Sequence, residues 1–323
     1  MKALVTGANG FLGSWLCKRL LNDGHQVTAL IRKNSDISEI ENLKIDYAYG
    51  DVTDLNSLRE AFKNKNHIYH LAGVVAYKAS DREKMNQVNI EGTRNVVQIC
   101  EEQKTEQLLH LSSVVAVGAS FKPEILNEDS EYTISNLNLG YFETKHIAEK
   151  IVMHAAAENK INAICVNPAT IYGPADAKKS SRKMQTKVAQ GKLPFYTGGG
   201  VNVVSVVDVI DGIINAVQYG KNGHRYILGS ENLTIQKLFE IIADCAGVSK
   251  PKIKIPTPLL HALGFIGDLT GIGISQENAY TASMYHWFDS AKAKNEIQFK
   301  PSDSTAAIES SVRWMKDHGY LDL

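Results

Sequence analysis

The sequence has few of the residues that build disulfide frameworks or metal centres. It contains four cysteines among 323 residues, and no two of them form a Cys-x-x-Cys pair. This favours reduced, buried thiols in a cytoplasmic protein. The closest histidines, His67 and His70, lie three apart in one extended segment and therefore on opposite faces, so we predict no metal site. The cysteines are Cys17, Cys100, Cys165 and Cys245.

An excess of charge of either sign is also missing. Lys plus Arg and Asp plus Glu each total 35, so nothing global attracts nucleic acid or an anionic membrane. The most apolar stretch, residues 257–274, is interrupted by His261, Asp268 and four glycines and is too broken for a spanning helix. We interpret it as a rim helix of a substrate pocket and leave open a weak contact with a membrane surface. Because a strand-like run begins at Lys2, we expect no signal peptide.

Short apolar runs alternate with segments of helical periodicity over the first two-thirds of the chain. Such alternation, with continuously apolar strands, predicts an α/β fold in which a doubly wound parallel sheet is covered on both faces. The expected strands are 3–5, 27–31, 45–49, 68–71, 108–111 and 163–166, and the expected helices are 12–22, 57–62, 85–100 and 141–158.

The rhythm changes after Pro168, which predicts a second, smaller C-terminal lobe. Residues 178–194 are polar and basic, and three consecutive glycines follow at 198–200. Further strands are expected at 203–207 and 226–228, and a helix at 234–246. We assign 1–174 to a dinucleotide-binding domain to which 198–230 returns, and 175–197 with 231–323 to the substrate-binding lobe.

A glycine-rich turn joins the first expected strand to the first helix. Gly7 allows the tight turn, Gly10 lets the backbone approach a pyrophosphate, and Gly13 lets the helix pack closely on the sheet. The pyrophosphate would lie at the helix N-terminus, where free N–H groups and the helix dipole favour an anion. This context predicts a Rossmann-type domain in which Asn9, Phe11 and Leu12 also contact the dinucleotide.

The Gly-x-x-Gly-x-x-Gly spacing resembles that of the extended short-chain dehydrogenases/reductases, the NAD-dependent epimerase/dehydratase superfamily. The likeness extends from Lys2 to about Pro301. It implies that Asp51, with Val52, meets the adenine, and that the strand end Leu71-Ala72-Gly73 passes under the adenosine ribose.

The end of the second strand indicates which dinucleotide binds. An NAD-selective site usually places an acid there to bond the ribose 2′-hydroxyl. Here Ile31 takes that place, and Arg32 and Lys33 follow. A guanidinium can bond a 2′-phosphate in a fork, which a carboxylate would repel. We therefore predict NADP(H) in preference to NAD(H).

Three residues far apart in the sequence form the predicted catalytic set. Tyr141 and Lys145 lie one helical turn apart on one face, where a cation can lower the pKa of a phenol. Ser113 ends the fifth strand and matches the catalytic serine of the family, with Ser112 as the alternative and as a cofactor contact. Ser113 would hold the substrate oxygen, Tyr141 would transfer the proton, and Lys145 would tune Tyr141 and hold the nicotinamide ribose.

The segment after the sixth strand resembles the part of the family that cups the nicotinamide and opens the substrate pocket. Its predicted cofactor contacts are Pro168, Ala169 and Ile171. Asp208 and Asp289 also resemble family landmarks, and we interpret both as structural caps or loop anchors.

Two branches of the family compete. One contains ketone reductases similar to dihydroflavonol 4-reductases and 3β-hydroxysteroid dehydrogenases, and the other contains nucleotide-sugar epimerases and dehydratases. The missing acid at Ile31 and the missing arginine after Gly200 favour the first, although basic residues at 178, 179, 182 and 183 could serve a sugar diphosphate.

We therefore expect an oxidoreductase that reduces a ketone or aldehyde, or oxidises a secondary alcohol, of a small, partly apolar substrate. A nucleotide-sugar epimerase and a non-catalytic NADP-binding regulator are the alternatives. The likeness further implies a homodimer formed through the helices at 85–100 and 141–158.

Overall fold

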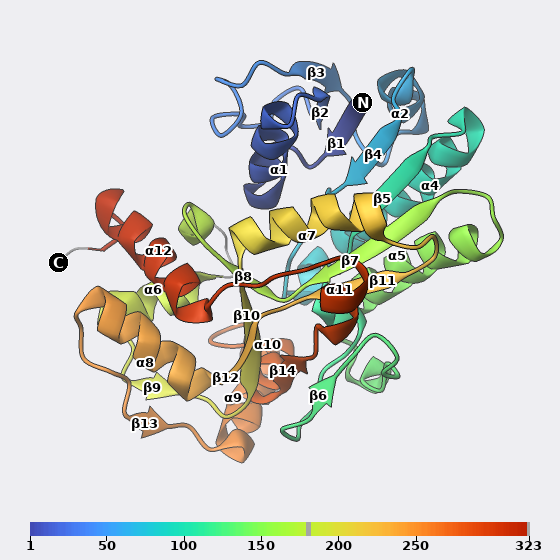
Figure 1. Cartoon of the computed structure of the whole chain (residues 1–323). Coiled ribbons are helices and arrows are strands. Elements are labelled where there is room, and N and C mark those ends of the chain that lie inside the picture. Colours follow the sequence, from blue (N-terminus) through green and yellow to red (C-terminus); the bar gives the residue numbers. More distant parts are fainter. Residues whose placement is uncertain (179–181, 322–323) are drawn as a thin grey trace.

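A seven-stranded parallel sheet forms the centre of the computed structural model, which describes residues 1–178 and 182–321 (Figure 1). The strand order reverses between β1 and β4, as in a doubly wound sheet, which confirms the predicted fold class. The six strands expected before residue 170 are all present, with ends that differ by at most two residues. In sheet order the strands are β11 (Arg225–Leu228), β7 (Ala163–Pro168), β5 (Gln107–Leu111), β4 (His67–His70), β1 (Lys2–Thr6), β2 (Gln26–Ile31) and β3 (Asp46–Tyr49).

Helices cover both faces of this sheet, which explains why its strands are continuously apolar. Alternate residues point to opposite faces, so Val5 enters the core beneath one helix layer and Leu4 enters the core beneath the other. The first layer consists of α1 (Phe11–Asn22) and α7 (Val206–Tyr219). The second layer consists of α2 (Leu55–Phe62), α4 (Gly92–Gln103) and α5 (Gly140–Ala157).

The helix expected over 85–100 is not continuous. It consists of α3 (Arg82–Met85), a π-helical stretch (Asn86–Glu91) and α4. Within the π-helical stretch, Asn89 is buried, accepts a hydrogen bond from the N–H of Val74 at 2.7 Å, and donates to the Val74 carbonyl at 3.0 Å. The irregular turn thus aims Asn89 at the loop after β4, a tertiary contact that helical periodicity does not reveal.

A second, smaller sheet lies beside the first and supports the C-terminal lobe. Its path is β12-β10-β14-β6, and β8 pairs in parallel with β10. A two-stranded sheet, β13-β9, lies at the edge of the lobe. These strands are β6 (Ile125–Leu126), β8 (Thr170–Tyr172), β9 (Phe195–Tyr196), β10 (Gly200–Ser205), β12 (Glu231–Thr234), β13 (Ile253–Lys254) and β14 (Tyr285–Phe288). The helices of this half are α6 (Lys183–Ala189), α8 (Ile235–Ala246), α9 (Thr257–Thr270), α10 (Gln276–Ser283), α11 (Ala291–Glu296) and α12 (Ser304–Asp317).

The strand expected at 203–207 ends earlier, at Ser205. The Ser205 hydroxyl accepts a hydrogen bond from the N–H of Val207 at 3.2 Å and thereby caps α7, so Val206 and Val207 are helical. Asp208, in the first turn of α7, accepts hydrogen bonds from the backbone and side chain of Ser302, both at 2.7 Å. Asp289 accepts the N–H of Ala291 at 2.9 Å. Asp208 thus anchors a distant segment to α7, whereas Asp289 makes a local contact, and both contacts are structural.

The chain passes between the two sheets more than once. β10 belongs to the smaller sheet, whereas α7 and β11, which follow it, belong to the larger one. Phe288 to Phe299 then packs back onto the core beneath α7. The division at residues 174, 197 and 230 stays a prediction. Among the described helices, none combines the length and the apolar character needed to cross a bilayer.

Candidate active site

The glycine-rich turn has the shape required for a phosphate cradle. Gly7 has φ of 66°, and a Cβ there would lie 2.8 Å from the backbone nitrogen of Ala72. A Cβ on Gly13 would lie 2.1 Å from the Gly7 carbonyl oxygen, so both positions exclude a side chain. Gly10 is the N-cap of α1 and makes no side-chain cap hydrogen bond. Phe11 and Leu12 begin the helix, whose first N–H groups have no intrahelical acceptor.

The predicted adenosine contacts lie along the neighbouring strand ends. Asp51 accepts hydrogen bonds from the N–H and hydroxyl of Thr53 through Oδ1, at 2.9 and 2.8 Å, and its Oδ2 has no partner among the described residues. Val52 is buried beside it. The Ala72 N–H donates to the Thr6 hydroxyl at 3.1 Å, which holds the Leu71-Ala72-Gly73 strand end against the glycine turn.

Arg32 and Lys33 follow β2 and are exposed, and neither forms an ion pair with another described residue. The loop that carries them is tied to the glycine turn, because the Asn9 side chain donates to the Asp36 carbonyl at 2.9 Å. Two cations that have no acidic partner in the described part of the chain therefore lie beside the end of β2, where an adenosine ribose would lie in a Rossmann-type domain.

The three predicted catalytic side chains converge beyond the carboxyl end of β5. Burial raises the pKa of the Tyr141 phenol, and a hydrogen bond between the Tyr141 and Ser113 side chains partly offsets this rise. Lys145 is buried on the same face of α5 and donates to the Leu111 carbonyl at 2.6 Å. Burial lowers the pKa of Lys145 to about 8, and the nearby Glu149 opposes that effect.

The structure distinguishes between the two consecutive serines. Ser113 begins a short 3-10 turn, Val114–Ala116, and its hydroxyl accepts the N–H of Val115 at 3.4 Å while facing Tyr141. The Ser112 hydroxyl is buried and has no hydrogen-bond partner among the described residues. The geometry therefore favours Ser113 as the serine that meets the substrate oxygen.

A buried polar network behind the catalytic set was missed in the sequence analysis. The Asn167 amide donates to the Ser113 carbonyl at 3.0 Å and to a Glu149 oxygen at 2.5 Å. The other Glu149 oxygen pairs with Arg225 at 2.8 Å. Glu149 lies one turn beyond Lys145 on α5, so the only sequence signal was an acid at the i+4 position from Lys145.

The segment after β7 runs from the larger sheet into the smaller one. Pro168 ends β7, and the N–H of Ala169 donates to the Leu228 carbonyl of β11 at 3.0 Å. Ile171 lies in β8 and pairs with Val204 of β10. The predicted cofactor contacts Pro168, Ala169 and Ile171 thus lie where the two sheets meet.

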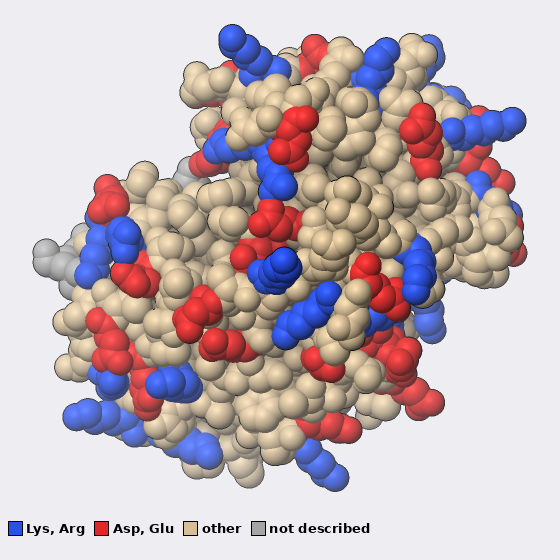
Figure 2. Space-filling view, viewed as in Figure 1, with Lys and Arg blue, Asp and Glu red and all other residues tan. Residues whose placement is uncertain are grey.

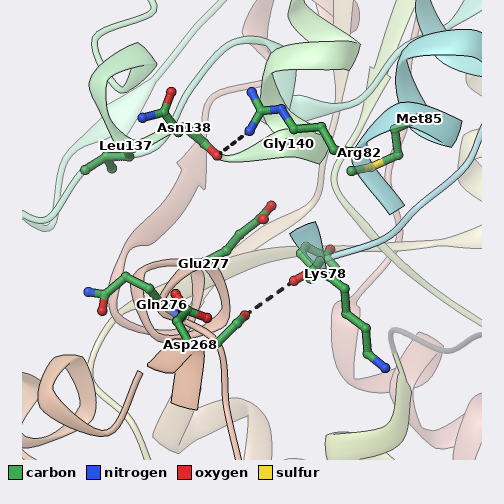
Figure 3. Close-up of a pocket in the computed structure, with 11 residues that line it drawn as sticks. Lys78, Arg82, Met85, Leu137, Asn138, Gly140, Asp268, Gln276 and Glu277 are labelled. Atoms are coloured by element: carbon green, nitrogen blue, oxygen red, sulfur yellow. Dashed lines mark hydrogen bonds between the residues drawn. The ribbon is translucent and has the colours of Figure 1, made fainter. Parts of the chain in front are cut away.

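A cavity of about 460 Å³ adjoins the N-terminal end of α5 (Figure 3). The close-up shows Glu277 of α10 pointing toward Gly140 and Arg82. Burial raises the pKa of the Glu277 carboxyl, and the N–H groups of Tyr141 and Gly140 oppose this rise. Leu139, the N-cap of α5, makes no side-chain cap hydrogen bond, so the smaller lobe supplies the acid at this helix end.

Tyr77 lines this cavity and also contacts Tyr141, the predicted catalytic tyrosine. Its ring packs edge-on against Tyr141, with ring centroids 6.0 Å apart, and its carbonyl accepts the Ser275 hydroxyl at 3.3 Å. Arg82 donates to the Asn138 carbonyl at 2.9 Å, as Figure 3 shows, and pairs with Glu143. The cavity is therefore lined largely by polar and charged residues, and Tyr77, one of them, lies against Tyr141.

The basic residues near 180 do not form a free phosphate site around Arg182. Arg182 is buried, pairs with Asp176 at 3.1 Å, and lies 3.7 Å above the Tyr172 ring. It also donates to the Ile171 carbonyl. Position 179 lies outside the described residues. Among the described residues no group of three or more His, Cys, Asp or Glu side chains could hold a metal ion.

Comparisons with known proteins place the chain in a family. Residues 3–229 match the family model described as "NAD dependent epimerase/dehydratase family". A Synechocystis protein named "Putative dihydroflavonol 4-reductase" is 29% identical over 328 residues, which cover 98% of this chain and 95% of the relative. "Sterol demethylase protein B" of Methylococcus capsulatus is 29% identical over 333 residues, covering 99% of this chain and 100% of the relative.

A solved structure, that of gox2253, agrees over nearly the whole fold. It is 32% identical in sequence, the TM-score is 0.90, and 99% of each chain is covered. This confirms the prediction, made from the glycine turn and the candidate catalytic residues, of an enzyme of the extended short-chain dehydrogenase/reductase type. The chain therefore belongs to the NAD dependent epimerase/dehydratase family.

Proposed function

We propose that this protein is an NADP(H)-dependent oxidoreductase that reduces a ketone or aldehyde, or oxidises a secondary alcohol, of a small, partly apolar substrate. The observation that carries the proposal is the convergence of Ser113, Tyr141 and Lys145 at the carboxyl end of β5. Ligands bind beyond this end of the strands in open α/β sheets. The names of the two relatives, a dihydroflavonol reductase and a sterol demethylase protein, are consistent with a reductase acting on a partly apolar compound.

The glycine turn fits a dinucleotide, because Gly7 and Gly13 leave no room for side chains and let β1 turn tightly into α1, whose N-terminus can bind a pyrophosphate. The nicotinamide would supply hydride transfer when bound. Ser113 would donate a hydrogen bond to the substrate oxygen, and Tyr141 would pass a proton to it during reduction. Lys145, when charged, would favour the phenolate left on Tyr141 and bond the ribose hydroxyls.

Arg32 and Lys33 support NADP(H) over NAD(H), because both are exposed cations without acidic partners among the described residues at the end of β2. The engagement of Arg182 with Asp176 and the Ile171 carbonyl removes one cation that a sugar diphosphate would need. Both observations favour the reductase over the nucleotide-sugar epimerase. The dimer through α4 and α5 stays a prediction, which sedimentation analysis would test.

The test is turnover of NADPH with a panel of aliphatic, aromatic and cyclic carbonyl compounds, compared between the wild type and Tyr141→Phe. We expect the wild type to oxidise NADPH with at least one class and the variant to lose about 100-fold or more in kcat, since a general acid contributes that much. The affinity for NADPH should stay within about twofold, because Phe keeps the ring that packs against Tyr77.

Tyr132→Phe is the matched control, because its ring stacks on His146 outside the proposed set. Its kcat should stay close to the wild-type value. Interconversion of UDP-sugars without net NADPH consumption would instead identify an epimerase. NADPH binding without turnover of any compound, unaffected by Tyr141→Phe, would identify a non-catalytic regulator. Substantial residual turnover in Tyr141→Phe would remove that residue from its role.

A further inference from the structure

The helix α9 turns its large apolar side chains toward solvent, whereas an ordinary surface helix turns them toward the core. Its buried positions are Leu260, Gly264 and Gly267. Two of these three are glycines, and the helix buries little of its own apolar surface against the protein. A surface helix normally turns its large apolar residues inward and its polar residues outward.

The two glycines are required by close packing. A Cβ on Gly264 would lie 2.8 Å from the Cβ of Ala279, and a Cβ on Gly267 would lie 1.9 Å from the Ile274 carbonyl oxygen. The glycines thus bring α9 against α10 and the turn between them. The inward face is consequently occupied by backbone, and the large side chains are left outside.

The outward face is strongly apolar. Of the 18 large hydrophobic side chains exposed among the described residues, seven lie within residues 259–274. The most exposed are Ile272 at 78%, Leu269 at 71% and Phe265 at 60%. The others in this set are Leu259, Leu263, Ile266 and Ile274. We call these seven residues the α9 apolar surface. Such a concentration marks an interaction site, whereas single exposed hydrophobics are ordinary.

The basic and acidic residues near this surface differ in whether they have partners among the described residues. Lys252 and Lys254 flank the exposed Ile253 just before α9, and neither lysine pairs with an acid among the described residues. Each of the two acids of the segment makes a contact within the protein, although Asp268 is exposed. Asp268 accepts the N–H of Gln276 at 3.2 Å, and Glu277 lies at the N-terminus of α5. An approaching surface would therefore meet the apolar side chains of α9, with these two lysines just before the N-terminal end of the helix.

Figure 2 agrees with this distribution. The lower end of the molecule, which carries α9 in Figure 1, is mainly tan, with both basic and acidic side chains at its margins. α9 is buried along only one narrow stripe, and its large apolar side chains lie on the opposite side of the helix. A rigid partner would cover only part of such a convex surface, whereas fluid acyl chains can surround it.

We propose that the α9 apolar surface docks the protein peripherally on phospholipid bilayers that contain anionic headgroups. Leu269, Ile272 and Phe265 would enter the boundary between headgroups and acyl chains, and Lys252 and Lys254 would contact the anionic headgroups. The docked face adjoins the cavity of Figure 3, because Asp268 of α9 also lines that cavity. A lipid-dissolved substrate would then have a short route to the site.

Flotation of the full chain with vesicles tests the proposal. One set of vesicles contains phosphatidylcholine alone, and the other adds about 30% phosphatidylglycerol, an anionic lipid. We expect the wild type to float with the anionic vesicles and more weakly with the neutral ones. The triple variant Phe265→Ser/Leu269→Ser/Ile272→Ser should lose at least about tenfold in partition constant, because three large apolar side chains would no longer enter the lipid.

A control triple variant, Met184→Ser/Val207→Ser/Tyr219→Ser, removes the same number of exposed apolar side chains from α6 and α7. It should float like the wild type. Lys252→Glu/Lys254→Glu should lose binding to the anionic vesicles and change little with the neutral ones. All variants replace exposed residues outside the catalytic set, so NADPH binding and thermal unfolding should match the wild type and confirm folding.

Three results would overturn the proposal. Failure of the wild-type protein to bind either kind of vesicle would show that the surface does not recognise lipid. Equal loss of binding in the two triple variants would show that the α9 residues have no special part. A wild-type dimer in sedimentation without lipid that becomes monomeric in the α9 variant would show that the surface meets a second copy of this chain.

Discussion

Burial shifts the pKa values of the two ionisable side chains at the centre of the site, Tyr141 and Lys145, in opposite directions. It raises the pKa of the Tyr141 phenol and lowers the pKa of Lys145 to about 8, because it disfavours the charged form of each. The Glu149 carboxylate opposes the effect on Lys145. The charge of Lys145 near neutral pH therefore depends on a residue that does not touch the substrate oxygen in the proposed reaction.

This arrangement predicts the pH dependence of reduction. A lysine is charged below its pKa, so kcat/KM should be maintained below about pH 8 and fall as the pH rises through that value. Glu149→Gln removes the carboxylate that raises the Lys145 pKa, so the alkaline fall should move to lower pH. The measurement is the pH profile of kcat/KM with NADPH and a carbonyl substrate found in the panel.

Glu143→Gln is the control, because Glu143 lies on the same helix and pairs with Arg82 instead. Its profile should match the wild type. The Glu149→Gln variant should also lose about 3 kcal/mol of stability, since Arg225 would be left partly unpaired. An unshifted profile combined with lower stability would mean that Glu149 only holds the fold together.

We expect Arg32 to determine the preference for NADPH over NADH. Arg32→Ala should weaken NADPH binding by about ten- to a hundredfold, the usual effect of losing a hydrogen bond to a charged group, and NADH binding much less. Dissociation constants for both dinucleotides, measured by fluorescence titration, test this. Arg94→Ala, an exposed arginine on α4, should change neither constant. Equal losses for NADPH and NADH would show that Arg32 does not contact the 2′-phosphate.

Among the helices and strands, the junction of β1 and α1 is the least tolerant part of the cofactor site. Gly13→Ala places a Cβ against the Gly7 carbonyl oxygen, and the nearest atoms are all backbone of Gly7 and Ala8, which leaves little room to adjust. We expect a loss of about 1–3 kcal/mol in the free energy of unfolding, typical of overpacking, together with weaker NADPH binding. Denaturant unfolding and cofactor titration measure the two effects.

Gly198→Ala is the matched control, because a Cβ there would meet only the Thr257 hydroxyl at 3.6 Å. Its stability and NADPH affinity should stay close to the wild-type values. Unchanged NADPH affinity in Gly13→Ala would contradict the proposal that the pyrophosphate lies over this turn.

The helices and strands also show which features the sequence pattern could predict and which it could not. The strands of the large sheet were predicted well, because a strand buried on both faces is a short, continuously apolar run. The expected strand at 203–207 was partly wrong, because Val206 and Val207 continue the apolar run into a helix. Ser205 was the sequence signal for this helix start, because serine is a common N-cap residue. No sequence signal indicated the π-helical stretch at 86–91, because this stretch depends on the tertiary contact between Asn89 and Val74.

Across the molecule as a whole, one buried ion pair ties the smaller lobe together. Asp176 accepts Arg182 at 3.1 Å and the Ser311 hydroxyl of α12 at 2.6 Å. Arg182 in turn reaches the Ile171 carbonyl of β8. The pair therefore links β8, α6 and α12, and both side chains are almost fully buried.

Asp176→Asn should destabilise the protein by about 3–5 kcal/mol, because Arg182 would keep a buried charge without its carboxylate. Thermal unfolding would record this as a lower Tm. Asp303→Asn is the control, since Asp303 is exposed and caps α12, and Asn caps nearly as well. An unchanged Tm for Asp176→Asn would mean that the pair contributes little.

The doubly wound fold and the glycine turn could be predicted from the sequence alone, because they depend on local periodicity and on fixed spacings. The three catalytic candidates came from the sequence together with its resemblance to a known family. Folding was needed to place Glu149, Asn167 and Arg225 behind Ser113, to bring Glu277 to α5, and to turn the apolar residues of α9 outward. The physical reason is that burial and electrostatic environment depend on which distant elements pack together. A glycine-lined contact such as that between α9 and α10 therefore reverses the face that hydrophobic composition would assign to the core.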